Sequence, residues 1–97
     1  MDILDPLFPL QVRAARALLG WTQKDLSNRA GVSELFVNRL ERGERITHAH
    51  KLGALRDVLL HAQVRFFSSD KEIGVAVEGE AASVLHLEWK GKRTTKP

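Results

Sequence analysis

One segment of the sequence, residues 22–43, leaves little freedom in how this chain can fold. It runs TQKDLSNRAGVSELFVNRLERG, with hydroxyl and glycine residues spaced at the ends of two possible helices. Thr22 and Ser33 are suited to N-caps, because their side chains can accept a hydrogen bond from a free backbone N–H. Gly31 and Gly43 can take the left-handed conformation that ends a helix. The segment therefore predicts two short helices joined by a tight turn.

Apolar residues in this segment indicate how the two helices pack. Leu26, Val32, Val37 and Leu40 are placed to bury a shared face. Packing of this kind would hold the second helix as a rigid element at the surface. A helix presented in this way fits the major groove of DNA, which is about 12 Å wide.

The flanking sequence predicts a further helix on each side. Before the segment, apolar residues at spacings of three and four predict an amphipathic helix that Gly20 ends; they are Leu10, Ala14, Ala17 and Leu18. After it, Thr47 is the expected N-cap of a helix with the apolar stripe Leu52, Leu55, Val58 and Leu59. We expect helices near residues 9–19, 22–29, 33–41 and 48–61, with Trp21 packed into the core.

Residues 10–61 resemble the Cro/CI-type helix-turn-helix family, also called the xenobiotic-response-element type. The resemblance rests on the motifs RAARALLGWTQKDLSNRAGVS and VNRLERGER. It is specific because the spacing sets the turn, two caps and a core together. Ser27 stands where the family usually has alanine, and it is small enough for the helix crossing. The resemblance implies a mostly α fold: a four- to five-helix lambda-repressor-like DNA-binding domain, here followed by a short β extension.

The resemblance also implies roles for individual residues. It places five residues of the second short helix toward the bases: Glu34, Leu35, Phe36, Asn38 and Arg39. Six other residues are expected to contact phosphates, either from the resemblance or from their position and basic character. They are Gln23, Ser33, Arg42, Arg45, His48 and Lys51. Arg16 and Glu41 are expected to form an ion pair that ties the first helix to the third.

Some of these roles have simpler alternatives. Phe36 can be a packed core residue instead of a base contact. Glu34 can be an acidic residue that the helix dipole stabilises in the first turn. Asn38 can reach a base or a phosphate. Arg39 is the hardest to explain without DNA, because its guanidinium suits guanine O6 and N7.

The sequence beyond residue 62 changes character and predicts β structure. The stretches VRFF, IGVAVE and VLHLEW are short and rich in β-branched, aromatic or alternating apolar residues. We expect three units: residues 8–62 as the helix-turn-helix domain, 63–89 as a β extension and 90–97 as a basic disordered tail. One small core is too small to bury so many apolar side chains, and this favours a homodimer with these strands at its interface. The alternative is a hairpin folded back on its own helices.

Charge is distributed unevenly along the chain. Residues 8–61 hold nine Lys/Arg and five Asp/Glu, residues 62–89 hold two and five, and the last eight residues add four basic side chains. A basic front fits a phosphate backbone, and the acidic middle suggests a different partner.

Composition argues against several other classes of protein. There is no cysteine, which excludes disulfides and thiolate metal sites and fits a reducing cytoplasm. The four histidines lack metal-ligand spacing, and we expect no metal, no cofactor and no enzymatic activity. The acidic N-terminus is unlike a signal peptide, and no apolar run is long enough to span a membrane.

The sequence thus predicts a bacterial, cytoplasmic regulator of transcription that binds double-stranded DNA. We expect a repressor that binds a palindromic operator as a homodimer. Two alternatives remain open at this point. The chain could be an antitoxin that also binds a toxin and regulates its own operon, or a module that binds another protein.

Overall fold

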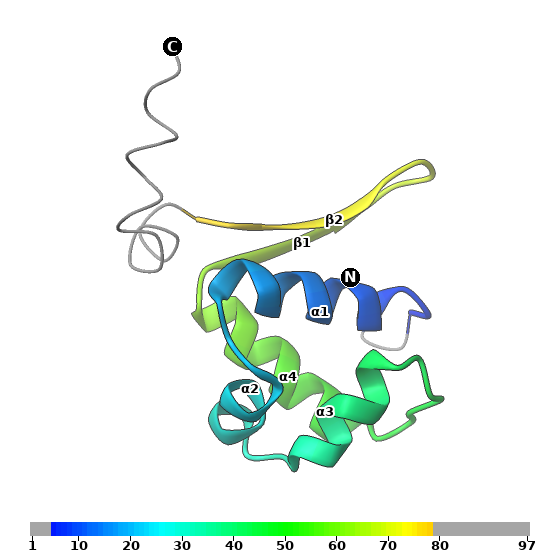
Figure 1. The fold of residues 1–97 in the computed structure, drawn as a ribbon. Coiled ribbons are helices and arrows are strands. Elements are labelled where there is room, and N and C mark those ends of the chain that lie inside the picture. The colour runs from blue at the N-terminus through cyan, green and yellow to red at the C-terminus, as the bar shows by residue number, and fades with distance from the viewer. Residues whose placement is uncertain (1–4, 79–97) are drawn as a thin grey trace.

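The computed structural model describes residues 5–78, which form a mostly helical domain with a small β-sheet (Figure 1). The four helices are α1 (Phe8–Leu19), α2 (Gln23–Ala30), α3 (Glu34–Glu41) and α4 (Ala49–His61). The two strands are β1 (Val64–Ser68) and β2 (Ile73–Val77). The helices pack around one core, and the hairpin lies along one side of α1 (Figure 1). The expected mostly α fold with a β extension is confirmed.

Local signals placed the helix ends to within about one residue. The Thr22 Oγ1 accepts from the Asp25 N–H at 3.0 Å, and the Ser33 Oγ accepts from the Phe36 N–H at 3.0 Å. Gly31 has a φ of +70° and ends α2 as expected. The predicted cap at Thr47 was wrong, because His48 occupies the N-cap position and offers no side-chain hydrogen bond there.

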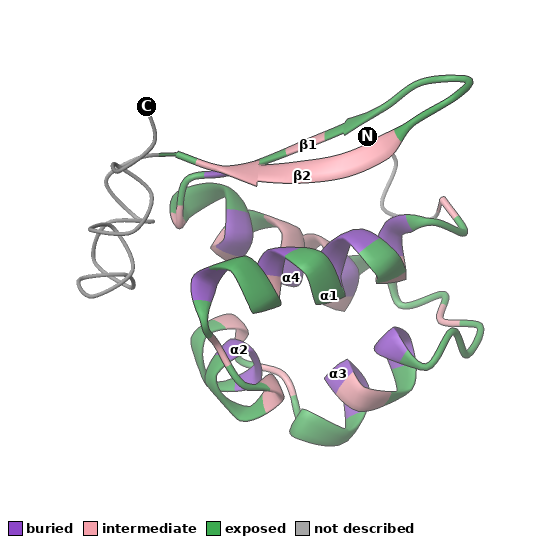
Figure 2. Ribbon diagram, turned by 45° about the horizontal axis from the view of Figure 1, so that its top comes forward, coloured by how far each residue is buried: buried purple, intermediate pink, exposed green. Residues whose placement is uncertain are grey.

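The buried face of α1 differs from the predicted one. The core takes Phe8, Val12, Ala15 and Leu19, whereas the predicted stripe of Leu10, Ala14, Ala17 and Leu18 is exposed (Figure 2). Both sets have helical spacing, so periodicity alone cannot choose between them. The buried set includes the large Phe8 ring, and its orientation also turns Arg16 toward α3.

The rest of the core follows the predicted pattern. Fully or nearly fully buried apolar side chains come from α2, α3 and α4: Leu26, Val37, Leu40, Leu52, Leu55 and Leu59. Val32, in the turn, and Val58 are partly buried against them. Trp21 also packs against this core but stays partly exposed, and the Arg29 guanidinium lies 4.2 Å from its ring centroid.

The hairpin is fastened to the helices by both apolar and polar contacts. Val64 is buried, and the Phe66 ring lies 5.9 Å from that of Phe8, centroid to centroid. Gln11 is only 1% exposed, and its Nε2 donates to the backbone oxygens of Phe67 and Gly74 at 3.1 and 3.0 Å. No motif or spacing in the sequence predicts this buried amide. The expected third strand and the basic tail lie outside the described residues.

Two glycine-to-alanine substitutions should change stability in opposite directions. Gly31→Ala should lower the free energy of unfolding by about 1 kcal/mol, because an L residue at a φ of +70° is strained although the added methyl meets nothing. Gly53→Ala, inside α4 and equally uncrowded, should raise it by about 1 kcal/mol. Urea denaturation followed by circular dichroism measures both. Shifts of the same sign would contradict the left-handed turn at Gly31.

Candidate nucleic-acid interface

The outer face of α3 carries the side chains best placed to contact a ligand. Glu34, Leu35 and Arg39 are exposed, and Asn38 is half-buried beside them. Leu35 is 54% exposed, so its apolar side chain is available to a ligand on this face. The inward side of the same helix is anchored by buried residues, so this face is presented rigidly.

Phe36 does not fit the predicted role in base contacts. Its side chain is only 8% exposed and belongs to the core. The Lys51 ammonium lies 5.4 Å from its ring centroid and covers it further. The alternative interpretation of Phe36 as a packed residue is therefore the one that matches the structure, because the ring sits on the inner half of the helix surface.

A shallow groove beside the start of α3 collects most of the residues expected to contact phosphate. It is lined by Ser33, Leu35, Phe36, Arg39, Arg45, Ile46, Thr47, His48 and Lys51. These lining residues include three permanent cations and a histidine, but no carboxylate. A concavity of this kind, at the N-terminus of a helix, favours an anion. Arg42 and Gln23, also expected at phosphates, do not line the groove.

The loop after α3 supplies a carboxylate that the sequence did not single out. Glu44 lies with its Oε1 3.8 Å from the Arg39 Nε, and its Oε2 contacts the Arg42 guanidinium. All three side chains are about half exposed. Such pairs are weak and exchange readily with water. Glu44 therefore lies close to both arginines and holds them only loosely.

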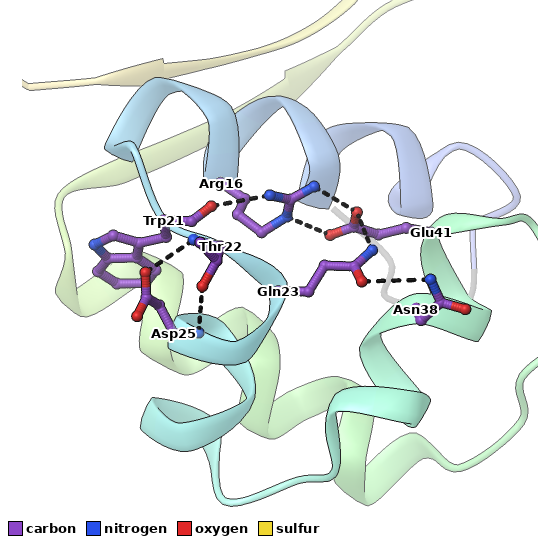
Figure 3. A network of polar contacts seen from close by, with 7 residues as sticks. All are labelled: Arg16, Trp21, Thr22, Gln23, Asp25, Asn38 and Glu41. Atoms are coloured by element: carbon purple, nitrogen blue, oxygen red, sulfur yellow. Dashed lines mark hydrogen bonds and ion pairs between the residues drawn. The ribbon is translucent and has the colours of Figure 1, made fainter.

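The predicted ion pair between α1 and α3 is present and is bidentate (Figure 3). The Arg16 Nε and Nη2 each donate to a different oxygen of Glu41 at 2.9 Å. A third donor, Nη1, binds the Trp21 backbone oxygen at 2.9 Å. The Glu41 side chain is only 3% exposed, and its hydrogen bonds raise the pKa of Arg16 above the usual arginine value. This pair fixes α3 against α1.

Gln23 and Asn38 extend that pair toward the outer face of α3 (Figure 3). The Gln23 Nε2 donates to the Glu41 Oε1 at 3.1 Å, and its Oε1 accepts from the Asn38 Nδ2 at 3.3 Å. The amide of Gln23 is thus partly engaged within the protein. One of its N–H groups is still free for an outside acceptor, since an amide nitrogen carries two hydrogens.

Asp25 closes a reciprocal cap at the start of α2. The Thr22 N–H donates to the Asp25 Oδ2 at 2.9 Å, while the Thr22 hydroxyl accepts from the Asp25 N–H. The hydrogen bond from the Thr22 backbone, and to a lesser extent that with its side chain, lowers the pKa of Asp25 below its usual 3.8. Because the folded pKa lies below the unfolded one, the resulting stabilisation is complete above the unfolded value and is lost as pH falls through the folded value.

We therefore expect the Asp25→Asn variant to lose less stability in acid than the wild type does. The free energy of unfolding of the variant, measured in urea between pH 7 and pH 2, should fall less steeply below about pH 4 than that of the wild type. Asp70→Asn, at an exposed aspartate in the hairpin turn, is the matched control. Equal acid dependence for wild type and Asp25→Asn would show that this cap contributes nothing through its charge.

The geometry as a whole defines a class of protein. Two short helices cross at a glycine turn, and the second presents polar side chains beside a basic groove: this is a helix-turn-helix DNA-binding domain. In agreement, residues 12–59 match the family model described as Helix-turn-helix, of the Cro/CI type. The chain belongs to this family, which consists of DNA-binding regulators of transcription and not of enzymes. A search of curated proteins gave no match.

Two other features are absent from residues 5–78. These residues contain no group of three or more His, Asp or Glu side chains that could hold a metal ion. In the same part of the chain, none of the helices is long and apolar enough to cross a membrane.

Proposed function

We propose that this protein is a bacterial, cytoplasmic repressor that binds a palindromic operator as a homodimer. The observation that carries the proposal is the exposed face of α3, with Arg39 beside a groove that holds further cations and no carboxylate. A dimer bound to an operator that overlaps a promoter would exclude RNA polymerase from that DNA, and on this basis we assign repression.

Base contacts are assigned to the outer residues of α3. Arg39 can donate two hydrogen bonds to guanine O6 and N7, and Glu34 can accept from cytosine N4. Leu35 supplies an apolar surface for a thymine methyl. Asn38 is held by Gln23 at one N–H and keeps its carbonyl oxygen and second N–H for a base or phosphate.

Phosphate contacts are assigned to residues that flank α3. Ser33, Arg45, His48 and Lys51 line the groove and would hold the backbone on one side. Gln23 and Arg42 lie outside it: Gln23 would contact a phosphate through its remaining N–H, and Arg42 after release from Glu44. These contacts set the position of the helix but carry no sequence information.

We propose a homodimer because its two-fold symmetry would match that of a palindromic site. Static light scattering at tens of micromolar should give twice the mass of one chain, with the C-terminal extension at or near the contact. A single-chain mass, both with and without DNA, would contradict the dimer.

Selection of bound duplexes from a random DNA pool tests the function directly. The expected outcome is an enriched palindrome whose half-sites are about one helical turn apart. A pool that stays random after repeated rounds would argue against sequence-specific binding. In that case the protein-binding alternative would replace the repressor.

A further inference from the structure

An exposed apolar stripe along α1, formed by Leu7 at its N-cap with Ala14 and Leu18, has no explanation in the DNA-binding surface. Leu7 is 43% exposed and Leu18 44% exposed, and Ala14 is also exposed. With Gln11 they follow one another at spacings of four, three and four, so all four lie along one side of the helix. Because Gln11 reaches the hairpin, this side of α1 borders the hairpin.

The neighbouring strand β2 has a free edge. Bonds join Glu78 to Gln63 and Ser69 to Glu72 at the two ends of the antiparallel ladder. Because bonded pairs alternate along such a ladder, Ile73, Val75 and Val77 turn their backbone N–H and C=O away from β1. Within residues 5–78, no other strand pairs with this edge.

One added strand could cover both the free edge of β2 and the stripe. Helix α1 packs under β2, and the two run in the same direction (Figure 1). A helix is about 10 Å wide and strands are about 4.8 Å apart. A strand added to the outer edge of β2 would therefore lie over the outer flank of α1, where the stripe is.

We propose that residues 84–89 of the same chain, Val-Leu-His-Leu-Glu-Trp, form a third strand antiparallel to β2 on this edge. Leu85, Leu87 and Trp89 alternate with His86 and Glu88, so one face of the strand is apolar. In the register that turns this face toward the helices, Leu85 lies opposite Val77 and Leu87 opposite Val75. The apolar face then covers the stripe of α1.

The dimensions and the connection agree with this arrangement. Six strand residues span about 20 Å, close to the roughly 18 Å length of the twelve-residue α1. Pairing from Val84 opposite Glu78 leaves residues 79–83 for the turn, an ordinary length for a hairpin. The basic residues Lys90, Lys92 and Arg93 would follow at the end that carries Asp70, Lys71 and Glu72, a turn with one net negative charge.

Pairs of cysteines introduced into the full chain can test which face of the strand meets α1 and whether the strand comes from the same chain. The natural sequence has no cysteine that would interfere. Ala14 lies one helical turn beyond Gln11, level with Val75 and hence with Leu87. We expect Ala14→Cys with Leu87→Cys to be bridged by the short thiol cross-linker dibromobimane within one chain. Ala14→Cys with His86→Cys, on the opposite face of the same strand, is the matched control and should react several-fold less.

Each outcome of the cross-linking decides the proposal. A fluorescent product at single-chain mass, formed preferentially by the Leu87→Cys pair, supports it. A cross-linked dimer would show that a second copy covers the stripe, and equal reaction of the two pairs would show that the strand does not dock in this register. Either of these results overturns the proposal.

Hydrogen exchange provides an independent readout of the backbone pairing. The Val75 amide points outward from β2, so its exchange in the full chain should be slowed at least about tenfold by a strand bond. Leu87→Asp should remove this protection, whereas His86→Asp should keep it. A Val75 amide that exchanges as fast as that of Asp70 in wild-type protein would overturn the proposal. Neither test involves DNA, so their result is separate from that of the proposed function.

Discussion

Replacing Glu41 by glutamine should lower the free energy of unfolding by about 3 kcal/mol. Glu41 is almost fully buried and holds two donors of Arg16 and one of Gln23. Glutamine keeps the volume but removes the charge, and it can accept at only one of the two positions. Arg16 is then left largely buried without its counterion, which is the costly situation for a broken ion pair.

Glu44→Gln is the matched control for this measurement. It makes the same chemical change at a carboxylate that pairs with two arginines, Arg39 and Arg42, but is about half exposed. Water screens such pairs, so the expected change is within about 1 kcal/mol. Urea denaturation at pH 7 compares the two variants. A Glu41→Gln protein as stable as Glu44→Gln would mean that the α1–α3 pair contributes no more than a surface contact.

Features that depend on neighbouring residues in sequence were predictable here. The caps at Thr22 and Ser33, and the left-handed Gly31, need only a few residues and the backbone groups that those residues leave free. The Arg16–Glu41 pair was predictable for another reason. It came from the family resemblance, which carries information about how the helices cross.

Features that depend on packing between elements were not predictable. The helix α1 has two stripes with helical spacing, and only the position of the hairpin and of α3 decides which is buried. Gln11 was missed because a buried amide needs two backbone oxygens from strands more than fifty residues away. Phe36 turned inward because Lys51 and the core surround its ring. Glu44 gave no signal, since its role depends on the path of the loop.

The DNA-binding surface leads to the second large effect, at Arg39. Arg39→Ala should weaken binding to the selected operator by about 10- to 100-fold, because a bidentate contact to guanine is worth roughly 1–3 kcal/mol. Binding to a scrambled duplex should change much less. In the free protein Arg39 is exposed and only loosely held by Glu44, at 3.8 Å, so the substitution leaves the fold intact.

Gln23→Ala provides the contrast, since we assign Gln23 to phosphate. A lost phosphate contact should weaken all duplexes alike and reduce the dependence of affinity on salt. Gln23 also positions Asn38, so a small part of its effect can be specific. Unfolding in urea must be measured for both variants, to separate binding from stability.

The deciding quantity is the ratio of operator affinity to scrambled-duplex affinity, measured by fluorescence anisotropy at two salt concentrations. Arg39→Ala should lower this ratio at both concentrations, because the bases and not the phosphates are affected. Gln23→Ala should leave it nearly unchanged while both affinities fall. An unchanged ratio for Arg39→Ala would remove Arg39 from the base contacts and leave it as one more cation beside the groove. Specificity would then have to come from Glu34, Leu35 and Asn38 or from the shape of the DNA, which depends on sequence at positions the protein does not touch.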